Sequence, residues 1–504
     1  MYAKLVWYRA GRQTCLAAIA ILWLSGFCFS QTLTISTKGG PPTTKVLVSG
    51  SGFAPDAAID VYFDTTDEAL ALANASGSFS DIQIQVPASA APGKHWVSAV
   101  QLSTDTGAQV PFTVNTNWVE VGFTANGKRL NPYENVLNAG NVGGIDVLWS
   151  YTTGSYVVSS PAVVNGVVYV GSGDNNVYAL NASTGAKLWS FTTGNSVISS
   201  PAVANGVVYV ASYDDNVYAL RATTGAKLWS FTTGASVWSS PTVAGDVVYV
   251  GSDDYSAYAL NASTGAELWN FPTGGLVYSA PAVANGQVYL GSWDGNVYAL
   301  NATTGAKLWS FTTGGGVYSS PSVANGVVYA GSADSNVYAL NALTGAKLWS
   351  FVTGSFLTAA PAVANGVVYI GSTDNNVYAL DASTGAKLWN FTTGNWVTSA
   401  PAIANGVVYV GSNDGNLYAL EASTGTELWS FTTGTYVSSS PAVANGFVYV
   451  GSGDNKVYAF GQTSAPAAKQ SSGGPDLRTL QPDLNLKPSQ PVRLSAKGTG
   501  LAAN

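Results

Sequence analysis

The chain has 504 residues, of which 46% are hydrophobic and only 9% are charged, and its formal net charge is −7. Such a length allows several domains, or one large ring of repeats with smaller flanking parts. An acidic, charge-poor chain has no basic surface for nucleic acid, so we exclude nucleic-acid binding.

Residues 1–30 have the layout of a secretory signal peptide. Three basic residues precede an apolar run from Cys15 to Phe29, which is shorter than the ~20 residues that span a membrane. We expect a cleaved signal and a secreted, periplasmic or cell-surface protein; an uncleaved membrane anchor is the alternative. Both cysteines, Cys15 and Cys28, lie here, so the mature chain is expected to have no disulfide and no thiolate site.

Residues 31–117 contain short alternating runs separated by Gly, Pro and Ser turns, which predicts a small antiparallel β-sandwich. The phrases SGSGFAP, ASGSFS and VPASAAPG resemble bacterial Ig-like domains of secreted proteins. The resemblance implies a spacer or an adhesive module. His95 is the only histidine of the chain; no second histidine can complete a metal or catalytic site, and we assign it no role.

A unit of 40 residues recurs over residues 147–460 without insertion or deletion. Each unit has four alternating runs closed by Asn-Gly, Asp-rich and Thr-Gly turns, which predicts four antiparallel strands. Eight units predict an all-β fold, an eight-bladed β-propeller of four-stranded blades behind the sandwich. The repeated tryptophans are Trp149, Trp189, Trp229, Trp269, Trp309, Trp349, Trp389 and Trp429.

The two ends of the repeat array complement each other. The strand at residues 147–153 precedes any complete unit, whereas the last unit, at residues 437–460, has no such strand after it. We therefore expect residues 147–153 to form the outer strand of the last blade and to close the ring without a free edge.

Residues 118–146 join the sandwich to the ring. With the following IDVLWSYTTG, they resemble the lead-in of quinoprotein (PQQ-dependent) alcohol dehydrogenases. The matching positions are Trp118, Gly122, Arg129, Asn131, Pro132, Asn141, Val142, Trp149 and Gly154. The repeated ALNASTGAKLW resembles the tryptophan-docking motif of that family, which implies that the repeat tryptophans are structural and join neighbouring blades.

The resemblance also implies PQQ and Ca²⁺ as cofactors of an alcohol or sugar dehydrogenase. That family needs oxygen ligands for Ca²⁺, an aspartate base and cations that hold the quinone carboxylates, often under a Cys-Cys disulfide. The mature chain has no cysteine, and the ring has only seven Lys or Arg residues. We predict no catalytic and no metal-binding residue, and we keep a divergent PQQ-dependent oxidoreductase as the alternative.

One aspartate recurs in each blade, in the turn between the second and third strands. We interpret these residues as turn formers that bond nearby backbone N–H groups, because a calcium site gathers about six to eight oxygens from unlike positions. They are Asp174, Asp214, Asp254, Asp294, Asp334, Asp374, Asp414 and Asp454.

The copies differ most in this turn and in the link from the outer strand to the next inner strand. By propeller connectivity both lie on one face. Aromatic residues collect there, namely Tyr156, Tyr213, Trp238, Tyr278, Trp293, Tyr318, Phe356, Trp396 and Tyr436. Such rings suit stacking on a sugar, a quinone-like ring or a peptide; alternatively, they only fill space between strands.

Residues 461–504 are rich in Pro, Ser, Gly and Lys without an aromatic residue, which predicts a disordered tail. For the whole chain we predict a monomeric, non-catalytic binding or scaffold protein of the cell envelope or surface. Its partner is expected to be an envelope or extracellular protein or a glycan. The outer-membrane assembly lipoprotein with a similar eight-bladed propeller is a precedent, although this chain lacks a lipid-anchor signal.

Overall fold

The computed structural model describes residues 31–463, 474–483 and 486–489. They form two compact units: residues 31–116 with the described C-terminal residues, and residues 117–463. The predicted signal peptide lies outside the described residues. Within them, no helix has the length and apolar character needed to cross a membrane.

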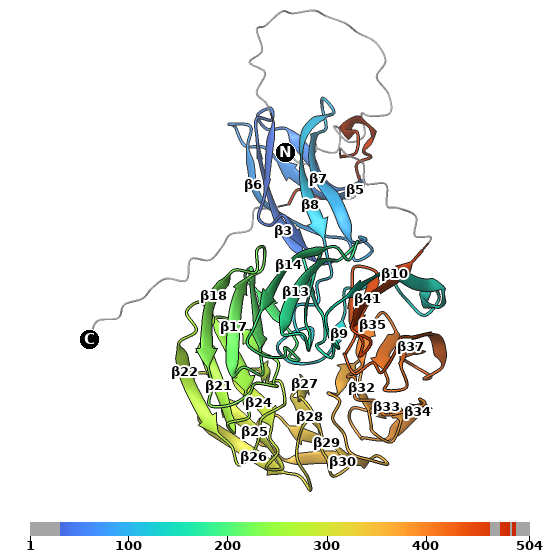
Figure 1. Cartoon of the computed structure of the whole chain (residues 1–504). Helices are drawn as coiled ribbons and strands as arrows, with labels where there is room; N and C mark the ends of the chain where they lie inside the picture. Colours follow the sequence, from blue (N-terminus) through green and yellow to red (C-terminus); the bar gives the residue numbers. More distant parts are fainter. Residues whose placement is uncertain (1–30, 464–473, 484–485, 490–504) are drawn as a thin grey trace, which may run out of the picture. The chain divides into compact units, whose positions relative to one another are not determined.

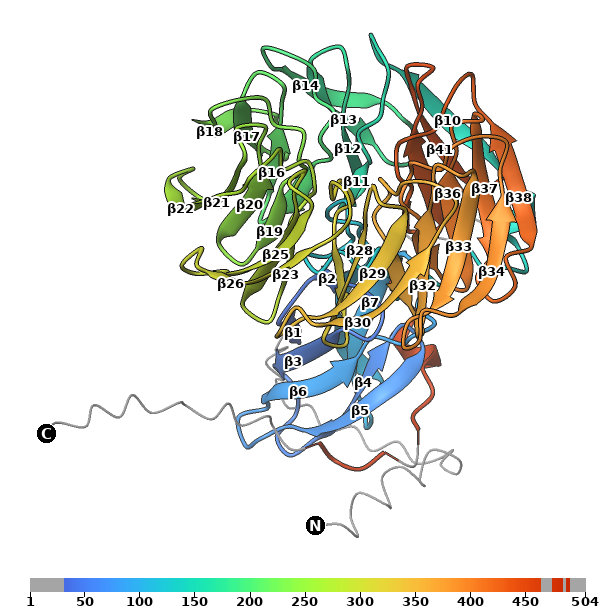
Figure 2. The same cartoon turned by 90° about the horizontal axis from the view of Figure 1, so that it is seen from below.

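The first unit is a two-sheet β-sandwich (Figure 2), as predicted. One sheet has the order β1-β3-β6 and the other β2-β8-β7-β4-β5. Alternate side chains of both sheets, such as Val46, Ile82, Val61 and Val97, pack into one core. The strands are β1 (Thr32–Ile35), β2 (Gly39–Gly40), β3 (Lys45–Ser51), β4 (Ala58–Phe63), β5 (Thr66–Leu72), β6 (Phe79–Gln85), β7 (Gly93–Gln101) and β8 (Thr106–Val114).

His95 on β7 has a structural role. Its Nδ1 and Nε2 lie 2.6 Å from Asp64 Oδ2 and 2.6 Å from the Ala91 carbonyl oxygen, so both ring nitrogens have an acceptor. The ring also stacks on Phe63 at 5.2 Å. The hydrogen bond to Asp64 raises the pKa of His95 and outweighs the opposing effect of burial. The His95 ring therefore ties β7 to the β4–β5 turn.

The described C-terminal residues pack on the sandwich. Leu480 is 1% exposed and contacts Tyr62 and Val100. The backbone N–H of Ser489 donates a 2.8 Å hydrogen bond to the Leu70 carbonyl oxygen. A short 3-10 helix, η3 (Leu477–Thr479), precedes Leu480.

Residues 461–504 were predicted to be disordered. The structure differs at residues 461–462, which end β41, and over residues 474–483 and 486–489. The composition of the tail cannot build a core of its own. Docking on an existing sandwich supplies the missing apolar surface and the hydrogen-bond partners.

The second unit is an eight-bladed β-propeller, which confirms the predicted fold. Figure 1 shows the blades arranged as a ring, with outer strands such as β22, β26 and β30 at the rim. Among the described residues, each blade is a four-stranded antiparallel sheet, and one blade gains a short fifth strand, β9 (Leu130–Asn131).

The strands of the first four blades are β11 (Ala162–Val164), β12 (Val167–Gly171), β13 (Asn176–Asn181), β14 (Lys187–Thr192), β15 (Ala202–Ala204), β16 (Val207–Ala211), β17 (Asn216–Arg221), β18 (Lys227–Thr232), β19 (Thr242–Ala244), β20 (Val247–Gly251), β21 (Ser256–Asn261), β22 (Glu267–Pro272), β23 (Ala282–Ala284), β24 (Gln287–Gly291), β25 (Asn296–Asn301) and β26 (Lys307–Thr312). Those of the next three are β27 (Ser322–Ala324), β28 (Val327–Gly331), β29 (Asn336–Asn341), β30 (Lys347–Val352), β31 (Ala362–Ala364), β32 (Val367–Gly371), β33 (Asn376–Asp381), β34 (Lys387–Thr392), β35 (Ala402–Ala404), β36 (Val407–Gly411), β37 (Asn416–Glu421) and β38 (Glu427–Thr432). The eighth blade consists of β39 (Ala442–Ala444), β40 (Phe447–Gly451), β41 (Lys456–Gln462) and β10 (Ile145–Thr152).

The ring closes as predicted. β10 pairs antiparallel with β41 over its whole length, from Ile145 opposite Gln462 to Thr152 opposite Lys456. The last and first blades are also joined by a 3.0 Å hydrogen bond from the Ser440 N–H to Ser160 Oγ, a contact that recurs at the four other junctions where the acceptor position is a serine. The equivalent bond one junction later measures 2.9 Å. The closing junction between the last and first blades thus has the same kind of contact as junctions within the chain.

Seven repeat tryptophans join neighbouring blades. Trp189 Nε1 on the first blade donates a 2.9 Å hydrogen bond to the Ala222 carbonyl oxygen, in the last hairpin of the second blade. Tyr169 donates its hydroxyl to the same oxygen at 3.2 Å. The seven indole bonds span 2.9–3.1 Å.

Trp429 differs from these seven. It is half-buried and packs edge to face on Phe460 at 5.2 Å. The reason is topological: the position 33 residues further along the chain is Gln462, at the end of β41, where the other copies have a hairpin alanine. The closing strand β10 enters from the other end of the chain, so the eighth blade has no such hairpin.

Residues 118–131 run along the inner strands of all eight blades, and we call this segment the belt. It is non-repetitive, and η2 (Val142–Gly144) follows it before β10. In chain order the belt bonds one residue of each inner strand: Trp118 with Val163, Val119 with Val203, Glu120 with Val243, Ala125 with Val283, Asn126 with Val323, Lys128 with Val363, Arg129 with Ile403 and Asn131 with Val443. The segment predicted to join two domains is thus also an integral part of the propeller.

Candidate functional site

The predicted aromatic residues lie at one end of the blades. Each inner strand starts at a link and ends at an Asn-Gly turn, or at Gly245-Asp246 in the third blade, and the second strand returns to the aspartate turn. The links and the aspartate turns therefore share one face of the ring, which we call the loop face. In the first blade they are residues 153–161 and 172–175.

Five of the nine predicted rings form a continuous arc. Tyr213, Trp238 and Tyr278 are stacked, with neighbouring ring centroids 4.7 and 4.8 Å apart. Trp293 lies edge to face 5.1 Å from Tyr278, and Tyr318 lies 4.7 Å from Trp293. Within the stack the rings cover each other's faces. Trp238 and Trp293 nevertheless remain 41% and 42% exposed.

The other four rings are more separated. Phe356 and Trp396 lie edge to face at 6.2 Å, and they are 39% and 49% exposed. Tyr156 lies over Gly173 of the next aspartate turn, where a Cβ would come within 2.7 Å of its ring. Tyr436 lies in the same way over Gly453 of the aspartate turn that follows it. The structure thus brings five rings together and leaves four as a looser group.

Asp253 adds a carboxylate to the arc. Burial, and then the negative charges of Asp254 and Asp215, raise the pKa of Asp253 to about 6. Within the described part of the chain, its Oδ1 is buried and has no hydrogen-bond partner. Burial and then the Asp253 charge raise the pKa of Tyr278. Asp253 was not among the predicted site residues; the available signal was an acid at a turn position where the other copies have neutral residues.

The repeated aspartates act as turn residues. Asp174 Oδ1 accepts a 3.0 Å hydrogen bond from the Asn176 N–H, and its Oδ2 accepts from the Gly154 N–H at 2.6 Å and the Tyr178 hydroxyl at 2.7 Å. The same three bonds recur in the other seven blades. Each aspartate therefore ties its turn to the preceding link and to the third strand.

Burial favours a raised pKa of Asp174, but its hydrogen bonds outweigh burial and hold that pKa below its usual value. Among the described residues, no cluster of three or more His, Cys, Asp or Glu side chains is placed to hold a metal ion.

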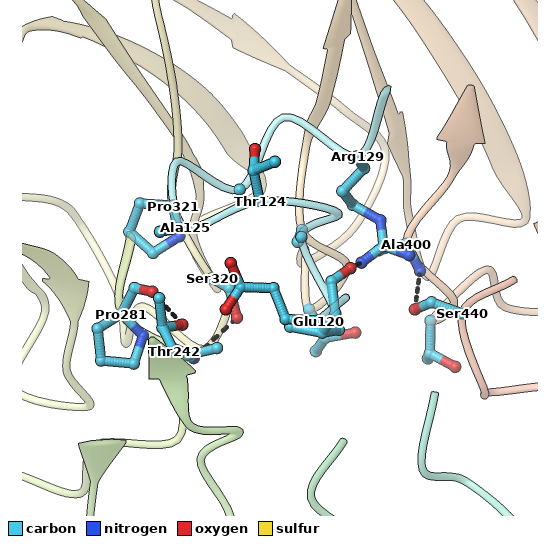
Figure 3. A pocket seen from close by; sticks show the side chains of 17 residues that line it. Glu120, Thr124, Ala125, Arg129, Thr242, Pro281, Ser320, Pro321, Ala400 and Ser440 are labelled. Carbon is cyan, nitrogen blue, oxygen red and sulfur yellow. Dashed lines mark hydrogen bonds between the residues drawn. The ribbon is translucent and has the colours of Figure 1, made fainter. Parts of the chain in front are cut away.

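A cavity of about 140 Å³ lies between the belt and the starts of the inner strands (Figure 3). Glu120 and Arg129 of the belt line it together with hydroxyl groups such as those of Thr242 and Ser440. Arg129 was predicted only as a position that matches the quinoprotein lead-in, and Glu120 was not among the predicted residues. The available signal was three charged residues, Glu120, Lys128 and Arg129, in a short segment of a charge-poor chain.

The repeats match two families of known proteins. The model of the β-propeller of β-alanine-activating enzyme matches residues 204–460, about half of the chain. The chain belongs to this β-propeller family. The model of outer membrane protein assembly factor BamB matches residues 139–239. No curated protein matches the sequence.

Several solved structures are similar to this chain in fold. BamB from Moraxella catarrhalis is 20% identical, with a TM-score of 0.56 over 63% of this chain and 99% of that one. Quinohemoprotein alcohol dehydrogenase from Comamonas testosteroni is 17% identical, with a TM-score of 0.61 over 69% and 80%. The computationally designed Ika8 protein is 21% identical, with a TM-score of 0.58 over 62% and 99%. At these identities the likeness shows the fold alone.

Proposed function

We propose that this propeller is a non-catalytic binding or scaffold protein of the cell envelope that holds a protein partner on its loop face. The observation that carries the proposal is the set of exposed rings on this face, of which Trp396 is the most exposed tryptophan at 49%. Protein interfaces favour Trp and Tyr and are poor in charge at their centre. The match to the model of an outer-membrane assembly factor supports an envelope setting.

Asp253 indicates which kind of side chain the partner presents to the arc. A carboxylate with a buried, unbonded oxygen among aromatic rings is costly unless a donor pairs with it. A basic side chain inserted beside Tyr213 and Tyr278 supplies that donor and also interacts with the ring faces or edges. We therefore infer a partner segment that combines apolar side chains with a lysine or an arginine.

The test uses binding of the full chain to purified envelope proteins and to a glycan array. The variant Trp396→Ala/Tyr436→Ala removes two exposed rings outside the arc. Each ring is expected to contribute ~1 kcal/mol or more to a protein complex, so the double variant should bind roughly 30-fold more weakly. Its melting temperature should change little, because Trp396 and Tyr436 are 49% and 37% exposed.

Leu343→Ala is the matched control, because Leu343 is 72% exposed in a Thr-Gly hairpin on the opposite face. It should leave binding unchanged. Asp253→Asn should weaken a partner that presents a basic residue and should leave a neutral glycan unaffected. A ligand whose affinity is equal in the wild type and the double variant would show that the rings are filler, and a glycan ligand would replace the protein partner.

The second candidate is a PQQ-dependent alcohol or sugar dehydrogenase, favoured by the fold likeness to a quinohemoprotein alcohol dehydrogenase. The residues present do not fit the PQQ–Ca²⁺ pair well. Both carboxylate oxygens of each repeated aspartate are engaged in its turn, as for Asp174. Absorbance spectra with PQQ and Ca²⁺, and dye reduction with alcohols and aldoses, test this candidate. Dye reduction that depends on both cofactors would overturn the non-catalytic proposal.

A further inference from the structure

Arg129 is a buried cation whose hydrogen-bonding capacity is only partly used. It is 1% exposed. Its Nε donates a 2.8 Å hydrogen bond to the Pro401 carbonyl oxygen, and its Nη1 donates to the Val121 carbonyl oxygen. Its Nη2 is buried without a partner among the described residues. Burial lowers the pKa of Arg129 to about 9, so the guanidinium stays charged at neutral pH.

Glu120 does not neutralise this cation. The carboxylate is 4% exposed and accepts a 3.2 Å hydrogen bond from the Val243 N–H. No ion pair within the described residues joins it to Arg129. Burial raises the pKa of Glu120 to about 8, against a smaller lowering by the Val243 bond, so its protonated form dominates at neutral pH. Both side chains line the same cavity (Figure 3). The charged Arg129 beside the neutral Glu120 gives this cavity a net positive charge.

A second buried polar group in the same cavity lacks a partner. Thr358 Oγ1 is buried and makes no hydrogen bond to the described residues. A buried cation and a buried hydroxyl without partners each cost free energy. Two such groups line one cavity. A small polar molecule bound there could pair with both, whereas an empty cavity leaves both without a partner.

We propose that this cavity binds a small carboxylate, with or without an ammonium group, through the free donor of Arg129. Guanidinium and carboxylate form the strongest charge-assisted hydrogen bonds available to side chains. The volume of about 140 Å³ is well below the roughly 300–1,000 Å³ of sites for drug-sized ligands and cofactors. A molecule of the size of acetate or glycine fits this limit. In the glycine case the ammonium group faces Glu120, and its positive charge lowers the pKa of Glu120 so that the ionised carboxylate pairs with it.

Saturation-transfer NMR on the full chain tests the site with acetate and with glycine at constant ionic strength. The wild type should transfer saturation to at least one of the two. Arg129→Gln should weaken that binding about tenfold, the effect of losing one charged hydrogen bond of ~1.4 kcal/mol. Arg221→Gln is the matched control, because Arg221 is exposed on the same propeller, and it should bind as the wild type does.

Two further variants keep the test decisive if Arg129→Gln does not fold. Thr358→Leu fills the cavity without changing any charge and should abolish binding of both probes. Glu120→Gln separates the two ligand sources: it should leave acetate binding intact and weaken glycine if the ammonium group is recognised. Absence of saturation transfer in the wild type, or binding that persists in both Arg129→Gln and Thr358→Leu, would overturn the proposal.

Discussion

Trp149 Nε1 donates a 2.9 Å hydrogen bond to the carbonyl oxygen of Ala182. Trp149 lies on β10, the outer strand of the last blade, whereas Ala182 lies in the last hairpin of the first blade. Tyr449 donates its hydroxyl to the same oxygen at 3.1 Å. The bond therefore crosses the point where the ring closes, and it reproduces the contact made at six other junctions between blades.

Replacing Trp149 with alanine should destabilise the propeller strongly. The indole is 8% exposed and joins two blades, and the loss of such a side chain costs about 3–5 kcal/mol. The half-buried Trp429 is the matched control, and Trp429→Ala should cost about 1–2 kcal/mol. Urea unfolding followed by circular dichroism gives both values. Equal losses for the two variants would contradict the role of the docked indole.

The glycine of the Thr-Gly hairpin is restricted both by its backbone conformation and by the tryptophan ring that packs on it. Gly225 has a φ of +71°, and a Cβ there would come within 2.6 Å of the Trp189 ring. Gly206 has a φ of +76° and open space around it. Gly206→Ala should cost about 1 kcal/mol from backbone strain alone. Gly225→Ala should cost about 1–3 kcal/mol more because of overpacking. Melting temperatures of the two variants test this difference.

The bonds between the turn aspartates and the tyrosines predict losses of stability at both ends of the pH range. Hydrogen bonds hold the pKa of Asp294 and of its counterparts Asp174, Asp334 and Asp374 below the usual value, against burial. Their contribution is therefore complete above pH ~4 and is lost as the pH falls through the lowered pKa values. Burial and the bond to Asp254 raise the pKa of Tyr258 to about 12.

The tyrosine contribution is accordingly lost as the pH rises from ~10 through the raised pKa. Melting curves from pH 2 to pH 12 should fall at both ends. Tyr298→Phe should be less stable than the wild type at pH 7 and should show a smaller acid loss, because Asp294 then lacks its tyrosine partner. If the melting temperature of this variant falls at low pH as much as that of the wild type, the stabilising role of the Tyr298–Asp294 hydrogen bond would be refuted.

His95 should titrate above its usual range. The Asp64 hydrogen bond raises the pKa of His95 more than burial lowers it. The stabilisation is therefore complete below pH ~6.5 and disappears as the pH rises through the elevated pKa. NMR of the single imidazole gives the pKa, and hydrogen exchange of the sandwich amides gives the stability. Asp64→Asn should bring the pKa back toward its usual value; a pKa that stays raised would contradict the pairing.

The sequence predicted the propeller because a strict repeat makes its local contacts eight times. The period, the turns and the position of Trp149 were sufficient for the number of blades and for closure. The belt was not predictable, since its partners are remote: Asn131 bonds the Val443 carbonyl oxygen across 312 residues. Docking of Leu480 on the sandwich was missed for the same reason.

For the loop face, connectivity predicted the common location of the nine rings. It did not predict which rings touch, because the stacking of Trp238 between Tyr213 and Tyr278 depends on side-chain directions across blades. The cavity depends on the path of the belt, so it could not be predicted from the sequence either.

The belt restricts the order and the number of blades that these nearly identical repeats can assemble into one ring. Blades that differ so little can pair in shifted order, and a ring with one blade more or fewer would preserve every junction between neighbours. The belt offers a different residue to each inner strand, from Trp118 at the first blade to Asn131 at the eighth. The length of the belt and the order of its residues therefore match a ring of eight blades in one order. A gene that gains or loses one repeat by recombination would leave the belt out of step with the ring.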